Sequence, residues 1–236
     1  MHKNVKAVLA QTGAVSGDFR LRKLEHVAGE EKTQTVHRES GCRFSVDVEK
    51  CFFSPRLFRE RMRVAKLVKN GETIVNMFAG VGCFSVIIAK YSNAKKVYSI
   101  DINPVALRHM QENIRANKTY SKIIPILADA KKVIQERLRY VADRVLMPLP
   151  EKALLYLPYA SQALRYSGGW IHYYDFEHAR KNEDSIDKVK LKVTEKLSNL
   201  DVAFEIPYGR VVRSTGPNWH QIVLDIKVRP SRKENH

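Results

Sequence analysis

The stretch TIVNMFAGVGCFSVIIAK, residues 73–90, joins a short β-branched run to a loop with two glycines and then to an apolar segment. A strand, a glycine loop and a helix in this order are typical of nucleotide-binding α/β domains, because glycine lets a ligand approach the backbone closely. The loop follows Phe78 and contains Gly80 and Gly82. A glycine loop alone is equally compatible with a tight turn that binds nothing, so other features of the chain must distinguish the two.

Strand and helix patterns alternate along the chain after residue 71. The strand candidates are residues 73–77, 96–100, 122–127, 144–149 and 168–174. The clearest helix between them spans residues 104–117, where apolar side chains recur at i+4 spacing. This alternation predicts a mostly parallel sheet with crossover helices. Residues 202–228 contain two strand patterns around the turn signal TGPN, so we expect the sheet to end in an antiparallel hairpin.

The part of the chain before this alternation has a different pattern. Residues 5–53 contain short strand and turn signals, and a helical pattern follows, with Ser54 as N-cap and Pro55 at the first helical position. The sequence therefore predicts three parts: a small β-rich module over residues 1–53, a linking helix over residues 54–70 and a Rossmann-like α/β domain over residues 71–236.

The predicted linking helix has two contrasting faces. An apolar stripe consists of Leu57, Val64, Ala65 and Val68, with Arg61 in its middle. A basic face consists of Arg56, Arg59, Arg63 and Lys66. This basic face and the C-terminal segment KVRPSRK, residues 227–233, are candidates for phosphate contacts, although a solvated surface would explain the C-terminal segment as well.

The 236 residues carry 41 Lys and Arg against 25 Asp and Glu, which gives a formal net charge of +16. An excess of this size indicates a polyanionic partner, RNA or DNA, although charge alone gives affinity without specificity. A hydrophobic content of 44% is enough for a buried core and argues against a disordered or fibrous protein. An RNA-binding module without catalysis would also explain the charge, so it remains an alternative.

The chain contains three cysteines, Cys42, Cys51 and Cys83, with no CxxC pair. This number and spacing predict neither a disulfide framework nor a zinc site, and His172 and His178 lack a third ligand at suitable spacing. No apolar run is long enough for a signal peptide or a membrane span. We therefore expect a cytoplasmic protein without a metal or a membrane partner.

Two carboxylates follow predicted strands of the sheet. Asp101, followed by Ile102, lies nineteen positions after Gly82, and Asp129-Ala130 follows the next strand. The first carboxylate could accept hydrogen bonds from both ribose hydroxyls of an adenosine, and the second could receive the adenine amino group. Alternatively, Asp101 caps the next helix and Asp129 is a turn residue. Because open α/β sheets bind ligands at the carboxyl ends of their strands, the combination favours an adenosine site.

The same loop helps to identify the adenosine ligand. The NAD fingerprint has a third glycine where this chain has Ser85. S-adenosylmethionine has no pyrophosphate to hold, and dehydrogenase sheets usually do not end in an antiparallel hairpin. These features favour S-adenosylmethionine over NAD.

The strings NMFAGVGCFSVIIAK and VYSIDINPVALRHMQENIRANK resemble the archaeal and eukaryotic class I tRNA methyltransferases that act on the guanosine beside the anticodon, together with their wybutosine-synthesising relatives. The resemblance extends through VSGDFR, HRESGCRF, FFSPRLFRER, GGWIHYYDF and VVRS, and covers about residues 5–228. It implies a class I methyltransferase fold, S-adenosylmethionine as cofactor and the anticodon region of tRNA as partner. It also implies these cofactor ligands: Ser54, Arg61, Phe78, Gly80, Gly82, Asp101, Ile102, Asp129 and Ala130.

Two branches of the family differ in the group that they transfer. The N1-methylating branch typically has Asn-Leu-Pro at the end of the fourth strand, where the Asn contacts guanine, whereas this chain has Pro148-Leu149-Pro150. Proline offers no amide donor for that contact. The methylating enzymes also generally carry an extra N-terminal domain, and this chain begins at the β-rich module. The resemblance therefore favours the branch that transfers the 3-amino-3-carboxypropyl group to C7 of 4-demethylwyosine at tRNA position 37, with N1-methylation of guanosine 37 as the alternative.

Chemistry at the sulfonium requires no metal, because the orientation of the bound cofactor decides which of its carbons meets the nucleophile. The attacked base carbon later loses a proton, and Asp175 is a candidate acceptor. His172, Tyr173 and Tyr174 precede it on the fifth predicted strand. Strand burial explains these three, whereas the resemblance suggests a rim on which a flipped base could stack.

Overall fold

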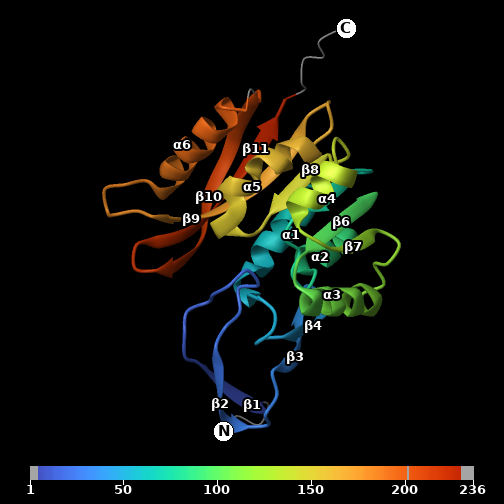
Figure 1. Ribbon diagram of the computed structural model, residues 1–236, viewed down its shortest axis with the longest axis vertical. Coiled ribbons are helices and arrows are strands. Elements are labelled where there is room, and N and C mark those ends of the chain that lie inside the picture. Colours follow the sequence, from blue (N-terminus) through green and yellow to red (C-terminus); the bar gives the residue numbers. More distant parts are fainter. Residues whose placement is uncertain (1–4, 201, 230–236) are drawn as a thin grey trace.

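The computed structural model describes residues 5–200 and 202–229, and its centre is a seven-stranded sheet (Figure 1). The strands lie in the order β10-β11-β9-β8-β5-β6-β7. Their bounds are β5 (Thr73–Asn76), β6 (Lys96–Asp101), β7 (Ile123–Leu127), β8 (Arg144–Met147), β9 (Gly169–His178), β10 (Phe204–Gly216) and β11 (Trp219–Val228). The pairs from β9 to β7 are all parallel, whereas β11 is antiparallel to both β9 and β10. The predicted mostly parallel α/β sheet with a C-terminal hairpin is confirmed.

Helices cover both faces of this sheet. Their bounds are the 3-10 helix η1 (Pro55–Leu57), α1 (Phe58–Leu67), α2 (Cys83–Tyr91), α3 (Pro104–Ala116), α4 (Ala130–Arg137), α5 (Pro150–Ala163) and α6 (Ser185–Ser198). On one face, Leu157 of α5 and Val193 of α6 pack in a buried cluster with Val75 of β5. The next strand residue, Ile74, points to the opposite face and joins a second cluster with Ile87 of α2. The result is a three-layered α/β fold with a hydrophobic core on each side of the sheet.

Two small antiparallel sheets precede the large one. β1 (Ala7–Gln11) pairs with β2 (Leu24–Gly29), and β3 (Gln34–Glu39) pairs with β4 (Cys42–Asp47). β2 is not predicted from the sequence because LEHVAG does not alternate apolar and polar residues. The β1–β2 pair extends away from the large sheet in Figure 1, whereas β4 packs against α3, where the Ser45 N–H donates to Asn113 Oδ1 at 2.6 Å. The small β-rich region predicted before the α/β fold is therefore present, and β4 connects it to the core.

Local signals decide where the helices begin. Asn103 caps α3, since its side-chain oxygen accepts hydrogen bonds from the Val105 and Ala106 N–H groups, and Pro104 occupies the first helical position. The expected cap at Ser54 is wrong in one respect, because its side chain makes no capping hydrogen bond. The segment first forms one 3-10 turn, and α1 then begins at Phe58. The carbonyl of Ser54, rather than its hydroxyl, is the group that makes a long-range contact, described below.

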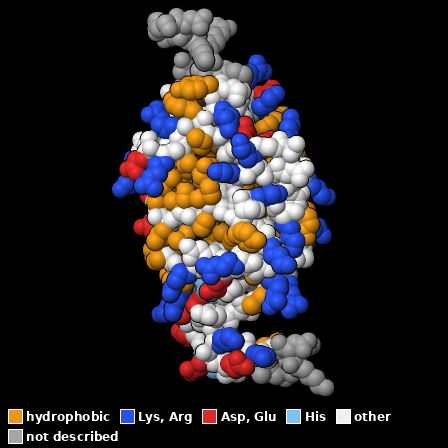
Figure 2. Space-filling model, turned by 90° about the vertical axis from the view of Figure 1, so that its right-hand side faces the viewer, with side chains coloured by type: hydrophobic (Ala, Val, Ile, Leu, Met, Phe, Trp, Pro, Cys, Tyr) orange, Lys and Arg blue, Asp and Glu red, His pale blue; other side chains and the backbone are white. Residues whose placement is uncertain are grey.

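Basic side chains are distributed over a wide surface. Figure 2 shows the side of the molecule that lies to the right in Figure 1, with Lys and Arg side chains scattered across it around a central hydrophobic patch. Exposed basic residues on α3 and α4 include Arg108, Arg115, Lys131 and Lys132. Net charge alone therefore does not locate the surface that a polyanion would contact. Within the part of the chain that the structure describes, no helix has the length and hydropathy needed to cross a membrane.

Candidate cofactor site

Six of the predicted cofactor residues line one cavity at the carboxyl ends of β5 to β8. The cavity is partly open to solvent, and the empty space in it, including that open solvent, is about 670 Å³. The six residues are Phe78, Gly80, Asp101, Ile102, Asp129 and Ala130. The strands end side by side at this edge, so the short loops that follow them converge although they lie far apart in the sequence.

Asp101 ends β6 and points into the loop that follows β5. Its Oδ2 accepts a hydrogen bond from the Gly80 N–H at 2.6 Å, and its Oδ1 accepts one from the Asn103 N–H at 2.9 Å. Burial raises the pKa of this carboxyl, and the backbone N–H donors only partly offset that effect. The capping alternative is wrong for Asp101, because Asn103 caps α3. Each carboxylate oxygen keeps a free lone pair, so Asp101 fits a pair of ribose hydroxyls.

The two loop glycines have different structural tasks, although both have positive φ angles, 56° at Gly80 and 87° at Gly82. A Cβ built on Gly80 would meet nothing closer than Phe52 O at 3.7 Å, so this glycine leaves open space at the cavity wall. A Cβ on Gly82 would lie 2.7 Å from Met110 Cγ. Gly82 therefore permits close packing of α2 on α3 and does not line the cavity.

Asp129 is the N-cap of α4. Its Oδ1 accepts from the Lys131 N–H at 2.8 Å and from the Lys132 N–H at 3.4 Å, so it caps the helix as well as facing the cavity. Its Oδ2 accepts from the Tyr156 hydroxyl at 2.6 Å. The N–H of Ala130 belongs to the first helical turn, where backbone donors lack an intrahelical acceptor. A carboxylate beside an available N–H suits the edge of an adenine ring.

The loop between β1 and β2 forms a wall of the cavity that the sequence did not predict. Asp18 and Arg20 lie on this loop, and both side chains contact the start of α5. Lys152 donates to Asp18 Oδ1 at 2.5 Å, and Arg20 forms an ion pair with Glu151. Phe52 contributes a further part of the wall. The contacts of Asp18 and Arg20 with α5 join segments more than a hundred positions apart, and no local pattern in the sequence predicts them.

Ser54 and Arg61 lie together, but outside the lining of this cavity. The Arg61 side chain is 3% exposed, and its Nε donates to Glu39 Oε1 at 2.6 Å. Both of its terminal nitrogens also donate to the Ser54 carbonyl, at 3.2 and 3.3 Å. The burial of Arg61 on an otherwise apolar stripe thus has a structural cause, the β3 carboxylate of Glu39. Cofactor contact by either residue stays a prediction.

β9 places His172, Tyr173 and Tyr174 inside the protein. Their exposed fractions are 0%, 0% and 1%, so burial is confirmed and the alternative of a base-facing rim is wrong for these three residues. Asp175 is partly exposed and accepts hydrogen bonds from the Tyr173 hydroxyl at 3.0 Å and the Phe176 N–H at 2.8 Å. Burial raises the pKa of Asp175. It does not line the cavity, and its role as proton acceptor stays a prediction.

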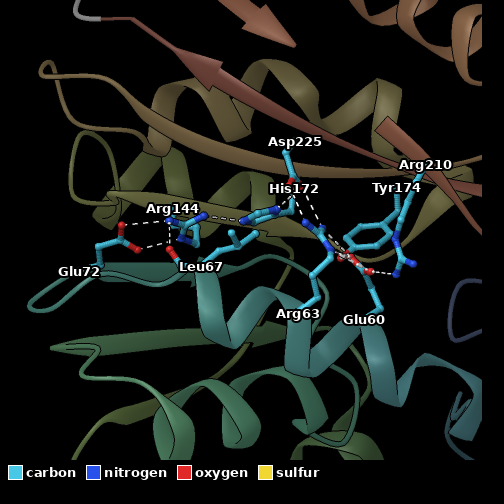
Figure 3. A network of polar contacts seen from close by, with 9 residues as sticks. All are labelled: Glu60, Arg63, Leu67, Glu72, Arg144, His172, Tyr174, Arg210 and Asp225. Atoms are coloured by element: carbon cyan, nitrogen blue, oxygen red, sulfur yellow. Dashed lines mark hydrogen bonds and ion pairs between the residues drawn. The ribbon is translucent and has the colours of Figure 1, made fainter. Parts of the chain in front are cut away.

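A buried polar network joins α1 to the sheet (Figure 3). Arg63 donates to Glu60 at 2.7 Å and to Asp225 of β11 at 2.6 Å, and Glu60 also accepts from the Tyr174 hydroxyl at 2.8 Å and from Arg210 at 2.5 Å. The expectation that Arg63 belongs to a free basic face is therefore wrong, because it donates hydrogen bonds to two carboxylates, Glu60 and Asp225. Burial alone would raise the pKa of Glu60, but hydrogen bonds to Arg63, Arg210 and Tyr174 hold it below its ordinary value.

The network continues through His172 to the other end of α1. Arg144 donates to His172 Nε2 at 2.7 Å, to Glu72 at 2.8 Å and to the Leu67 carbonyl at 2.8 Å. Because a guanidinium can only donate, His172 Nε2 must be an acceptor, so its proton is on Nδ1 and points to Asp225 Oδ1 at 2.6 Å. Burial lowers the pKa of His172, and the neighbouring Arg144 favours the same neutral form.

The described residues contain no group of three or more His, Cys, Asp or Glu side chains that could hold a metal ion. The three cysteines are free thiols, each buried in the hydrophobic core beside β4 and α2. The lining of the cavity offers carboxylates, aromatic rings, backbone N–H groups and basic side chains.

Comparison with known proteins places this geometry in a family. The family described as TRM5/TYW2 methyltransferase domain matches residues 35–202. A tRNA (guanine(37)-N(1))-methyltransferase Trm5b from Pyrococcus abyssi is 40% identical over 97% of this chain and 66% of its own length. Its crystal structure superposes with a TM-score of 0.84. The chain spans 60% of a second Trm5b, from Methanocaldococcus jannaschii, at the same 40% identity.

Relatives with the other chemistry are nearly as similar. A tRNA(Phe) (4-demethylwyosine(37)-C(7)) aminocarboxypropyltransferase from M. jannaschii is 37% identical over 94% of this chain and 86% of its own length. The crystal structure of M. jannaschii TYW2 in complex with AdoMet has a TM-score of 0.72 and 32% identity over 88% of this chain and 91% of that one. With a family match over most of its length and these relatives, the chain belongs to the TRM5/TYW2 methyltransferase family.

Proposed function

We propose that this protein transfers the 3-amino-3-carboxypropyl group of S-adenosylmethionine to C7 of 4-demethylwyosine at position 37 of tRNA(Phe) and releases methylthioadenosine. The enzyme class, an S-adenosylmethionine-dependent tRNA-modifying enzyme, follows from the family. A cytoplasmic location is part of the proposal.

The cavity supports S-adenosylmethionine as the cofactor. Asp101 offers oxygens to the ribose, while Asp129 and the Ala130 N–H offer an acceptor and a donor to the adenine. When bound, S-adenosylmethionine supplies electrophilic carbons on a sulfonium. Related TYW2 crystals contain AdoMet in the M. jannaschii protein and MeSAdo in the Pyrococcus horikoshii protein.

Our choice of the aminocarboxypropyl group over the methyl group rests on the position of Pro148. Pro148 and Leu149 follow β8 and line the cavity, on the wall where the N1-methylating branch typically has an Asn. Pro148 has neither a side-chain amide nor a backbone N–H, so it cannot donate to the edge of a guanine. Without that contact the pose that methylates guanosine loses a hydrogen bond, and a different orientation of the sulfonium becomes the productive one.

In the proposed reaction, C7 of the base forms a bond to the γ-carbon of the methionine moiety as the bond between that carbon and sulfur breaks. The sulfur keeps the electron pair and leaves as methylthioadenosine, and the base then loses the proton of C7. We propose Asp175 as the acceptor, directly or through water. Burial raises its pKa, which makes it a stronger base than an ordinary Asp.

Methyl transfer is the second candidate, because several relatives that match at 39–40% identity are named as methyltransferases. One of them, Taw21 from Saccharolobus solfataricus, is named as a tRNA 4-demethylwyosine(37)-methyltransferase. Whether this chain acts on guanosine or on 4-demethylwyosine is therefore a separate question from whether it transfers a methyl or an aminocarboxypropyl group.

One assay separates these activities. The purified protein is incubated with S-adenosylmethionine and either tRNA(Phe) carrying 4-demethylwyosine or the unmodified tRNA with guanosine 37, and products are identified by mass. We expect methylthioadenosine and an aminocarboxypropyl adduct with the first tRNA and no methyl transfer to the second. S-adenosylhomocysteine with either tRNA would overturn the proposal in favour of methyl transfer.

A further inference from the structure

Tyr156 of α5 connects the aromatic wall of the cavity to Asp129. Its side chain lines the cavity together with Phe78 and Asp129. Its hydroxyl donates to Asp129 Oδ2 at 2.6 Å. Because Tyr156 is only 9% exposed, most of the solvent is kept away from this contact. The hydrogen bond therefore belongs to the wall of the cavity and is stronger than the same contact would be on an open surface.

Two further aromatic rings hold the Tyr156 ring in place. The ring centres of Tyr156 and Phe78 lie 5.2 Å apart with their planes inclined at 72°, and those of Tyr156 and Tyr159 lie 6.0 Å apart at 65°. Both are edge-to-face arrangements, which aromatic pairs favour. A turn of the ring would disturb both contacts. Packing therefore directs the hydroxyl toward Asp129 in addition to the hydrogen bond itself.

The carboxylate of Asp129 keeps little free capacity for a ligand. A carboxylate has about four lone-pair positions, shared equally by its oxygens. Oδ1 accepts from the Lys131 and Lys132 N–H groups at the start of α4, and Oδ2 accepts from the Tyr156 hydroxyl. The position that remains is on Oδ2. Because Tyr156 occupies the neighbouring position on the same oxygen, it restricts the direction from which a further donor can approach.

The edge formed by Asp129 and Ala130 has a fixed order of acceptor and donor. Burial raises the pKa of the Tyr156 hydroxyl, and its hydrogen bond to Asp129 raises it further, so the hydroxyl keeps its proton and stays a donor. Asp129 Oδ2 therefore faces a ligand as an acceptor. The Ala130 N–H beside it is a donor of the first turn of α4. Adenine presents the complementary order, an amino donor at N6 and an acceptor at N1, whereas hypoxanthine presents an acceptor at O6 and a donor at N1.

We propose that Tyr156 is a positioning residue that makes the cavity selective for adenine, because it holds Asp129 Oδ2 as the acceptor for the N6 amino group. This inference rests on the proposed function for the placement of the adenine against Asp129 and Ala130. A hypoxanthine ring in the same place would set its O6 against Oδ2 and its N1–H against the Ala130 N–H. Two acceptors and two donors would then face each other without a partner, which is costly in a partly buried site.

Three substitutions test this role. Tyr156→Phe removes only the hydroxyl and keeps the ring that packs on Phe78 and Tyr159. Tyr159→Phe is the matched control, because it removes a hydroxyl from the neighbouring ring of α5, which does not line the cavity. Asp129→Asn replaces a carboxylate oxygen by an amide that donates, while Asn is as good a helix N-cap as Asp.

The probes are S-adenosylhomocysteine and S-inosylhomocysteine, which differ only in carrying adenine or hypoxanthine, and binding is measured by calorimetry. We expect the wild type to prefer the adenine compound by about 10–100-fold, as for one or two mismatched hydrogen bonds. Tyr156→Phe should lower this preference about 3–10-fold, mainly through weaker binding of the adenine compound. Asp129→Asn should lower it by at least as much, and Tyr159→Phe should leave both affinities within about twofold of the wild type.

The ratio of the two affinities separates positioning from mere support of the cavity wall. If Tyr156→Phe weakens both compounds equally, or changes neither, the inference is overturned. If Asp129→Asn also leaves the ratio unchanged, the adenine does not lie against Asp129, and the proposed placement of the cofactor fails together with the inference. If Asp129→Asn lowers the ratio and Tyr156→Phe does not, only the role of Tyr156 fails. Neither compound reports on the transferred group, which the product assay decides separately.

Discussion

The cofactor cavity and the polar network under α1 are built in opposite ways. Apart from the wall formed by the β1–β2 loop and Phe52, the cavity uses short loops that directly follow β5, β6, β7 and β8, so each of these motifs is continuous in sequence. The network joins residues separated by 162 positions between Arg63 and Asp225 and by 28 between Arg144 and His172. The cavity has backbone groups and open space, whereas the network has paired charges that are mostly buried. Substitutions should therefore affect binding in the first region and folding in the second.

The largest effect is expected from Asp225→Ala. Asp225 is 5% exposed and accepts from both Arg63 and His172, so its removal leaves the buried His172 N–H without its acceptor and leaves Arg63 to pair with Glu60. Breaking a largely buried charge pair costs up to about 3–5 kcal/mol of unfolding free energy. Urea denaturation followed by circular dichroism measures this loss.

Lys190→Ala is the matched control for Asp225→Ala. Its ion pair with Asp187 lies on the surface, with exposed fractions of 41% and 70%, and such pairs contribute about 0–1 kcal/mol. Similar losses in the two variants would mean that the network contributes no more to folding than a surface pair does.

The glycine loop gives the next largest effect. In Gly82→Ala the backbone strain of a positive φ costs about 1–2 kcal/mol, and the new methyl group must also displace Met110. Gly71→Ala has a φ of 80° but nothing within 4 Å of the new Cβ, so it carries only the backbone strain. The difference between the two variants, about 1–3 kcal/mol by the usual cost of overpacking, measures the contact of α2 with α3. Equal losses would remove the packing argument for Gly82.

Asp101→Ala should act on binding rather than on folding. The loss of charged hydrogen bonds to a bound ribose is expected to weaken cofactor affinity by roughly 1.5–3 kcal/mol. Calorimetric titration with S-adenosylmethionine measures this change, and the urea midpoint checks that the fold is intact. Affinity equal to that of the wild type would exclude Asp101 from the cofactor site.

The sequence predicts the residues of the cavity that directly follow a strand in the chain. The β5 loop, Asp101 and Asp129 are found because a strand pattern precedes each of them, and the parallel topology brings them to one edge. Arg20 and Phe52 are missed because nothing local indicates that the β1–β2 loop reaches α5. Arg63 is assigned to a basic face for phosphate contact because helical periodicity cannot reveal Asp225, which lies on the last strand. Ion pairs between residues far apart in the sequence depend on tertiary packing, and the periodicity of a single helix or strand does not reveal that packing.

The smallest effect concerns the pH dependence of stability and depends on His172. Its pKa is lowered by burial from an ordinary value near 6.5, so the folded protein keeps His172 neutral while the unfolded chain takes up a proton. Its contribution to stability is therefore fully present above pH 6.5 and is lost progressively as the pH falls toward the lowered pKa, with a slope of up to about 1.4 kcal/mol per pH unit. In His172→Gln an amide can still accept from Arg144 and donate to Asp225, but it cannot take up a proton. Urea unfolding between pH 7.5 and about 5 should thus show a smaller loss of stability in His172→Gln than in the wild type, whereas His26→Gln, at an exposed position on β2, should keep the wild-type slope. If His172→Gln keeps that slope as well, His172 takes up its proton equally in both states, and its pKa is not lowered in the folded protein.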